Sequence, residues 1–280
     1  MKVIKTAAYL LFVLSSVPAP MVHAQSDDAR AMAHQLMVRS GMSVQLRGFT
    51  AQVEAETKKN ATNLDEKMVT ALVASGKEAF RADLLEEDIT ARLIKKLTVG
   101  DMKGALAWLE TDTGRRLTQA EEVASATFDE RGLLEYAETL KAKPLGLKRT
   151  KLISEVISAS NAVRAYAAMI EAITLGVAIG LDTLQPADRR QGEARLRAKM
   201  LERMPPDKVQ AGLAQQLPIV FALMYRDISD ADLAGYVGFL KSVSGKRYGD
   251  GMTGAFTEGV RQASIRVGEL VGQRQRNTAM

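Results

Sequence analysis

Apolar residues recur along this chain at spacings of three and four, and this period constrains the fold more than any other feature. Such spacing places side chains on one face of an α-helix. Strand patterns, in which β-branched and aromatic residues alternate strictly between tight turns, are absent from the sequence. We therefore predict an all-α protein, a bundle or array of helices. Two of the stripes are Leu85, Ile89, Leu93 and Leu97, and Val209, Leu213, Leu217 and Phe221.

A segment near the middle of the chain recurs 131 residues later. The aligned pairs include Trp108 with Phe239, Thr111 with Ser242, Gly114 with Gly245 and Arg116 with Arg247. A fainter similarity at an offset of 120 pairs Leu36 with Val156 and Ser40 with Ser160. Similarity at a fixed offset is typical of repeated structural units. We predict two related helical modules, residues 25–143 and 144–280, joined near the helix-breaking Pro144 and Gly146.

The repeated segment has the pattern of two consecutive helices with a bend between them. In the second copy, Ser229 is a typical N-cap, and the acidic residues that follow it suit the positive end of a helix dipole. This helix should end near Lys241, and a new helix should begin within Ser242–Arg247. Gly245 then lies in the first turn, where the missing side chain lets the backbone or the ring of Phe239 approach closely.

An anion site is the alternative interpretation of the same bend. Free N–H groups at a helix start, with the hydroxyls of Ser242 and Ser244 and the cations Lys246 and Arg247, would suit a phosphate or carboxylate. The order of residues is not that of a P-loop, and no strand precedes it. We therefore favour the structural bend over the anion site.

These residues resemble a family of exported bacterial proteins, domain of unknown function 2059. The resemblance rests on Tyr225, Asp230–Leu233, Phe239–Ser242 and Gly245–Arg247. It is best over residues 213–261, and a weaker likeness covers residues 89–126. The family often has proline after the serine, whereas this chain has Val243 there. The resemblance implies an exported, all-helical module and brings no catalytic residue.

The first 24 residues have the features of a cleavable signal peptide. Lys2 and Lys5 precede an apolar stretch from Ala7 to Val17, and small residues then lead to Ala24. The apolar stretch is well short of the ~20 residues that span a bilayer. We predict cleavage after Ala24 and a periplasmic location.

The remaining composition excludes several kinds of chemistry. The chain has no cysteine, which excludes disulfides and thiolate sites. After cleavage it would keep one histidine, His34, too few for a two-histidine metal site. The formal net charge of +5 predicts at most a weak attraction to anionic membrane surfaces. The sequence lacks a dense basic face with interleaved aromatic residues, so it does not indicate nucleic-acid binding. We predict no metal and no cofactor.

Acidic clusters are the remaining route to hydrolysis. They are Glu54 with Glu56, Glu86–Asp88, and Glu121–Glu122. Each lies beside an apolar stripe, where we expect a solvated helix face. A glycosidase would need two carboxyls across a cleft with rings for the sugar, and the chain has one tryptophan.

The most apolar stretch outside the leader is Ala165–Leu181. It contains Gly176 and Gly180, a spacing that permits close contact between helices. The charged residues Arg164 and Glu171 favour a buried core helix over a membrane span.

Two polar segments are expected to face solvent. Residues 189–203 carry several arginines opposite Leu196, Met200 and Met204, so we expect an ordinary charged outer face, with a membrane-surface role as the alternative. Residues 273–280 are polar and terminal and are expected to fray.

Together these features predict an exported, non-enzymatic protein that binds a partner protein or another envelope component between or beside its modules. The alternatives are an envelope hydrolase that uses carboxylates and a carrier of an apolar ligand held between helices. Methionines, of which the chain has 13, would give a carrier an adaptable lining.

Overall fold

Helices form nearly all of the computed structural model, which describes residues 27–49, 65–127 and 129–278 and contains no strand within them. The all-α prediction is therefore confirmed. The predicted signal peptide and the pair Glu54 and Glu56 lie outside the described residues. The helices before the predicted boundary are α1 (Asp27–Arg39), residues 42–49, α3 (Glu66–Ala79), α4 (Ala82–Lys96), α5 (Val99–Leu109), α6 (Asp112–Thr127) and α7 (Glu130–Ala142). Those after it are α8 (Leu147–Ala159), α9 (Ala162–Asp182), the short 3₁₀ turn η2 (Ala187–Arg189), α10 (Gly192–Arg203), α11 (Pro206–Met224), α12 (Asp230–Lys241) and α13 (Val243–Thr278).

Side-chain caps start the helices of the repeated segment. The Ser229 hydroxyl accepts a hydrogen bond from the Asp232 backbone N–H at 3.0 Å, and α12 ends at Lys241 as predicted. In the first copy, the Thr98 hydroxyl accepts from the Asp101 N–H, and the Asp101 carboxylate accepts from the Thr98 N–H. Such a capping box satisfies backbone donors that a helix start leaves free.

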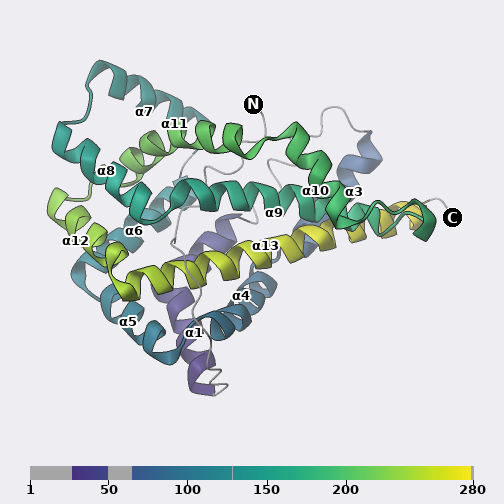
Figure 1. Cartoon of the computed structure of the whole chain (residues 1–280), viewed down its shortest axis with the longest axis horizontal. Helices are drawn as coiled ribbons and strands as arrows, with labels where there is room; N and C mark the ends of the chain where they lie inside the picture. Colours follow the sequence, from purple (N-terminus) through teal and green to yellow (C-terminus); the bar gives the residue numbers. More distant parts are fainter. Residues whose placement is uncertain (1–26, 50–64, 128, 279–280) are drawn as a thin grey trace.

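Side chains from both halves of the chain form one hydrophobic core. The 36-residue helix α13 lies along α9 and also packs on α3, α4 and α5 of the first half (Figure 1). Conversely, helices α6 and α7 of the first half pack on α11 of the second half. The predicted boundary at residues 143–144 falls in the short link between α7 and α8, and the two halves interlock across it.

Glycines allow α9 and α13 to approach closely. A Cβ atom on Gly180 would lie 2.0 Å from the carbonyl oxygen of Ile265, and one on Gly268 would lie 2.5 Å from the Leu181 nitrogen. The close contact predicted for Gly176 and Gly180 is therefore found, with α13 as the partner. Helix α9 is also long and apolar enough to cross a membrane. The core helices of soluble proteins meet the same criteria, so this finding is weak evidence for a membrane span.

The first helix of each half is followed by a residue with positive φ. Helix α8 has the bounds of α1 displaced by the 120-residue offset. Gly41, two residues after α1, has a φ of 72°, and Asn161, two residues after α8, has a φ of 51°. Glycine and asparagine are the residues that adopt this left-handed conformation most readily.

The expected fraying of the C-terminus is wrong for residues 273–278. Helix α13 continues to Thr278. Arg274 explains this order, because its guanidinium donates to the Ser75 hydroxyl at 3.2 Å and pairs with Glu78 at 2.5 Å. A polar terminal segment stays helical when its side chains bind a neighbouring helix, here α3.

Candidate functional site

The second copy of the motif forms a tight bend between α12 and α13. The Ser242 hydroxyl donates to the Phe239 carbonyl oxygen at 2.6 Å and accepts from the Gly245 N–H at 3.0 Å. A Cβ atom on Gly245 would lie 2.0 Å from the same carbonyl oxygen. Gly245 lies in the first turn of α13 as predicted, and the group that comes close to it is the backbone of Phe239.

The first copy forms the same bend between α5 and α6. The Thr111 hydroxyl donates to the Trp108 carbonyl oxygen at 2.7 Å and accepts from the Gly114 N–H at 3.0 Å. The aligned rings of Trp108 and Phe239 stack on each other, with centroids 4.1 Å apart and ring planes 8° apart. The two bends therefore meet directly.

Two ion pairs join the copies in a reciprocal manner. Arg247 of the second copy pairs with Asp101 of the first at 3.0 Å, and Arg116 of the first pairs with Asp232 of the second at 2.6 Å. Hydrogen bonds from Arg116, Ser229 and Thr113 hold the pKa of Asp232 well below its ordinary value. Under the 131-residue offset each pair is the counterpart of the other.

The four candidate anion-binding residues take part in different contacts. Ser242 caps the bend, and Arg247 pairs with Asp101. Ser244 lies against Gly104, where a Cβ atom would come within 2.4 Å of the serine Oγ. Lys246 is exposed. These contacts favour the structural bend, and the anion site stays a prediction.

Glu121 is the clearest departure from the sequence analysis, which expected it on a solvated face. Its side chain is buried, with 2 % of the residue exposed, and it accepts a hydrogen bond from the Tyr225 hydroxyl at 2.9 Å. Burial raises the pKa of Glu121 well above 4.5. A carboxyl enclosed in the core cannot reach a substrate. The missed signal is its spacing, because Glu121 lies four residues after the buried Leu117 and three before the buried Ala124.

An open groove between α1 and α4 holds His34. The Ser43 hydroxyl donates to Glu86 at 2.7 Å, and the His34 Nε2 atom lies 3.5 Å from the same carboxylate oxygen. In a nucleophilic triad the imidazole must contact the hydroxyl. Here the carboxylate lies between the two groups, so they do not form a triad. Asp88, from the same acidic cluster, pairs with Arg92 at 2.8 Å.

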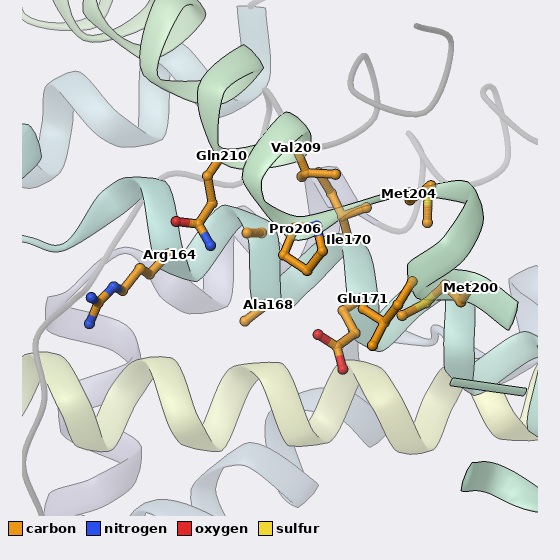
Figure 2. Close-up of a pocket in the computed structure, with 11 residues that line it drawn as sticks. Arg164, Ala168, Ile170, Glu171, Met200, Met204, Pro206, Val209 and Gln210 are labelled. Carbon is orange, nitrogen blue, oxygen red and sulfur yellow. The ribbon is translucent and has the colours of Figure 1, made fainter. Parts of the chain in front are cut away.

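A cavity of about 190 Å³ lies between α9, α10 and α11 (Figure 2). Helix α9 brings Arg164, Ala167, Ala168, Ile170 and Glu171 to it, the end of α10 brings Met200, Leu201 and Met204, and the start of α11 brings Pro206, Val209 and Gln210. Most of these side chains are apolar. Pro206 begins α11 at a position where proline is well tolerated, and it turns the chain so that α11 returns along α9.

The cavity has a polar end and an apolar end. Arg164 and Gln210 lie at one end, and Met200 and Met204 lie at the other (Figure 2). Glu171 is neutralised by Arg197 of α10 at 2.6 Å. From the sequence, Met200 and Met204 were predicted on the apolar side of an arginine-rich helix, and Arg164 and Glu171 were predicted only as charges on α9. Their meeting at one cavity is not predictable from the sequence, because the cavity depends on how α10 lies against α9.

The family described as uncharacterized protein conserved in bacteria (DUF2059) matches residues 83–141. This segment runs from α4 to α7 and contains the first copy of the motif, whereas the best likeness was predicted at residues 213–261. The best likeness is therefore reassigned to the first copy. No curated protein and no solved structure was found to match the chain. Over residues 83–141 the chain is therefore similar to the DUF2059 family, an uncharacterized family of bacterial proteins.

Proposed function

We propose that the chain is an exported, non-enzymatic binding protein of the cell envelope and that it binds an apolar ligand in the cavity between α9, α10 and α11. The observation that carries this proposal is the lining of the cavity. Eight of its eleven residues are alanine, isoleucine, leucine, methionine, proline or valine. Ligand sites are typically apolar hollows with a few polar groups that fix orientation.

The groove between α1 and α4 is less suited to an apolar ligand. It is lined by Arg30, Ala31, His34, Asp83, Glu86, Glu87 and Thr90, of which only Ala31 is apolar. Arg30 and Glu87 already face each other there at 3.4 Å. A hydrolase that used this groove would also need a hydroxyl or water next to a free base, and the one described hydroxyl donor to Glu86 is the buried Ser43.

The reciprocal contacts support a duplicated architecture. Two copies that arose by duplication would contact each other through equivalent residues. Each contact from the first copy to the second would then have a counterpart from the second copy to the first. The pairs Asp101–Arg247 and Arg116–Asp232 fit this pattern. In this proposal the paired bends form the structural junction, and the cavity lies away from it in the second half.

A filled-cavity variant tests the proposed site. Ala168 lies on the cavity wall (Figure 2), so Ala168→Phe places a ring where the ligand would lie. We expect the mature protein to bind a long-chain alcohol such as dodecanol, measured by calorimetry, and Ala168→Phe to weaken binding by at least about tenfold. Excluding two methylene groups from an apolar site costs roughly 1.6 kcal/mol, slightly more than a factor of ten.

The matched control is Ala107→Phe on α5, because Ala107 is exposed and does not line the cavity. This variant should bind dodecanol as the parent does. Absence of binding by the parent, or equal binding by Ala168→Phe and the parent, would overturn the proposed site.

A further inference from the structure

Arg164 is a cation at the polar end of an otherwise apolar cavity. It precedes Ala167, Ala168 and Glu171 by three, four and seven residues, so these side chains share one face of α9. Among the described residues, no carboxylate lies within ion-pair distance of its guanidinium. The residue is exposed and its side chain extends outwards from this end of the cavity, so the charge lies at the rim, where a molecule that enters from solvent meets it (Figure 2).

The second charged residue of the cavity does not cancel this cation. Glu171 pairs with Arg197 at 2.6 Å, and Arg197 also lies 3.8 Å from Glu193. The ion pair neutralises the carboxylate and leaves Arg164 as the unbalanced charge of the lining. Beside Arg164, the Gln210 amide adds a group that can donate hydrogen bonds (Figure 2).

The dimensions and the lining favour a single flexible chain. A cavity of about 190 Å³ is below the roughly 300–1,000 Å³ of pockets that enclose whole drug-sized ligands, so it suits part of a single chain whose remainder extends from its open side. Met200 and Met204, at the far end, are unbranched and adapt to irregular apolar partners. A guanidinium prefers carboxylate and phosphate oxygens, which it binds with two parallel hydrogen bonds.

We propose that the ligand is an anionic single-chain amphiphile, with its chain between α9, α10 and α11 and its headgroup at Arg164. This inference rests on the proposed function, because it names the ligand class of the same cavity. The exposed cations Lys199 and Arg203 of α10 support it by attracting anions to this side of the protein. Arg164 is thereby a binding residue that selects the headgroup.

Three ligands of equal chain length separate the headgroup from the chain. The mature protein is titrated calorimetrically with dodecanoate, dodecanol and dodecyltrimethylammonium at neutral pH, below their micelle-forming concentrations. We expect dodecanoate to bind about tenfold more tightly than dodecanol, since a hydrogen-bonded charge contributes that much or more, and the cationic amphiphile to bind least.

Two arginine variants assign the preference to one residue. Arg164→Gln should abolish the preference for dodecanoate and leave dodecanol binding unchanged. Arg195→Gln is the control, because Arg195 is an exposed cation of α10 that does not line the cavity, and it should keep the preference. Inorganic phosphate without a chain should not compete with dodecanoate at equal concentration.

The outcomes distinguish the inference from the proposed function. If dodecanol and dodecanoate bind equally and Ala168→Phe weakens both, the headgroup inference is wrong and the apolar site stands. If Arg195→Gln and Arg164→Gln lower the preference equally, general charge attraction replaces a specific headgroup site. If none of the ligands binds, both proposals are wrong.

Discussion

A single methyl group added to Gly245 tests the bend between α12 and α13. In the folded chain this Cβ atom would lie 2.0 Å from the Phe239 carbonyl oxygen and 2.7 Å from its carbon. Both atoms belong to the backbone, so relief requires the bend itself to move. Gly238 of α12 offers a matched control in the same segment, because a Cβ atom there would meet nothing within 4 Å.

The two substitutions should change stability in opposite directions. Alanine is favoured over glycine in a helix interior by about 0.5–1 kcal/mol, so Gly238→Ala should raise the free energy of unfolding by that amount. At Gly245 the same gain is outweighed by overpacking against the backbone, and a net loss of about 1–3 kcal/mol is expected. The variants should therefore differ by roughly 1.5–4 kcal/mol.

Urea denaturation of the mature protein, followed by far-ultraviolet circular dichroism, measures these differences. The midpoints should shift without a change in slope, because the surface exposed on unfolding is unchanged. Gly114→Ala should follow Gly245→Ala, since its Cβ atom would lie 2.4 Å from the Trp108 carbonyl oxygen. If Gly245→Ala is as stable as Gly238→Ala, the packed bend is refuted.

The anion interpretation of the same bend makes a separate prediction. An anion that binds only the folded state stabilises it by RT ln(1 + c/Kd), where c is the free anion concentration, so the effect grows with the logarithm of the anion concentration above Kd. Phosphate added at constant ionic strength would then raise the melting temperature of the parent and not of Lys246→Ala. The structural bend predicts no specific phosphate effect, and it predicts that Lys246→Ala changes stability by less than about 0.5 kcal/mol.

Two further predictions concern Glu121 and the leader. Burial raises the pKa of Glu121 in the folded state above its ordinary value of 4.5. This group therefore stabilises the folded state fully at pH values below 4.5, and the stabilisation is lost as the pH rises towards the raised pKa. Glu121→Gln keeps an acceptor for the Tyr225 hydroxyl without the ionisation, so its urea midpoint should exceed that of the parent increasingly as the pH rises above 4.5 towards the raised pKa. Parallel pH profiles would contradict this. Amino-terminal sequencing of protein from the periplasm should find Gln25 first, and a retained Met1 would exclude the predicted cleavage.

Local signals in the sequence predicted the helices and the bend well. The stripe from Leu85 to Leu97 is buried, and Ser229 caps α12. These features depend on residues within a few positions of one another, where helix geometry alone fixes which side chains meet. The same holds for the approach of Gly180 to a neighbouring helix, although the sequence could not name α13 as that neighbour.

Features that depend on the packing of distant helices were harder to predict. The acidic cluster at Glu121 suggested solvent exposure, yet its position on the buried face of α6 places it beside Tyr225, 104 residues away. The cavity arises in the same way, because it depends on how α10 and α11 pack against α9. Periodicity within α6 places Glu121 on the buried face but does not name Tyr225 as its partner. No pattern within one helix predicts the cavity.

A single pair of aligned residues explains why the halves differ after the bend. Under the 131-residue offset, Asp129 aligns with Val260. Asp129 caps α7 by accepting a hydrogen bond from the Gly132 N–H at 2.6 Å, which favours a new helix start, whereas Val260 is fully buried within the continuous α13. The first half therefore turns at this point and sends α7 onto α11, where Tyr136 donates to the Ala222 carbonyl oxygen at 3.3 Å. The second half continues straight along α9. The glycine face of α9 is thereby occupied by α13, which leaves the face with Arg164 and Ala168 to form the cavity with α10 and α11.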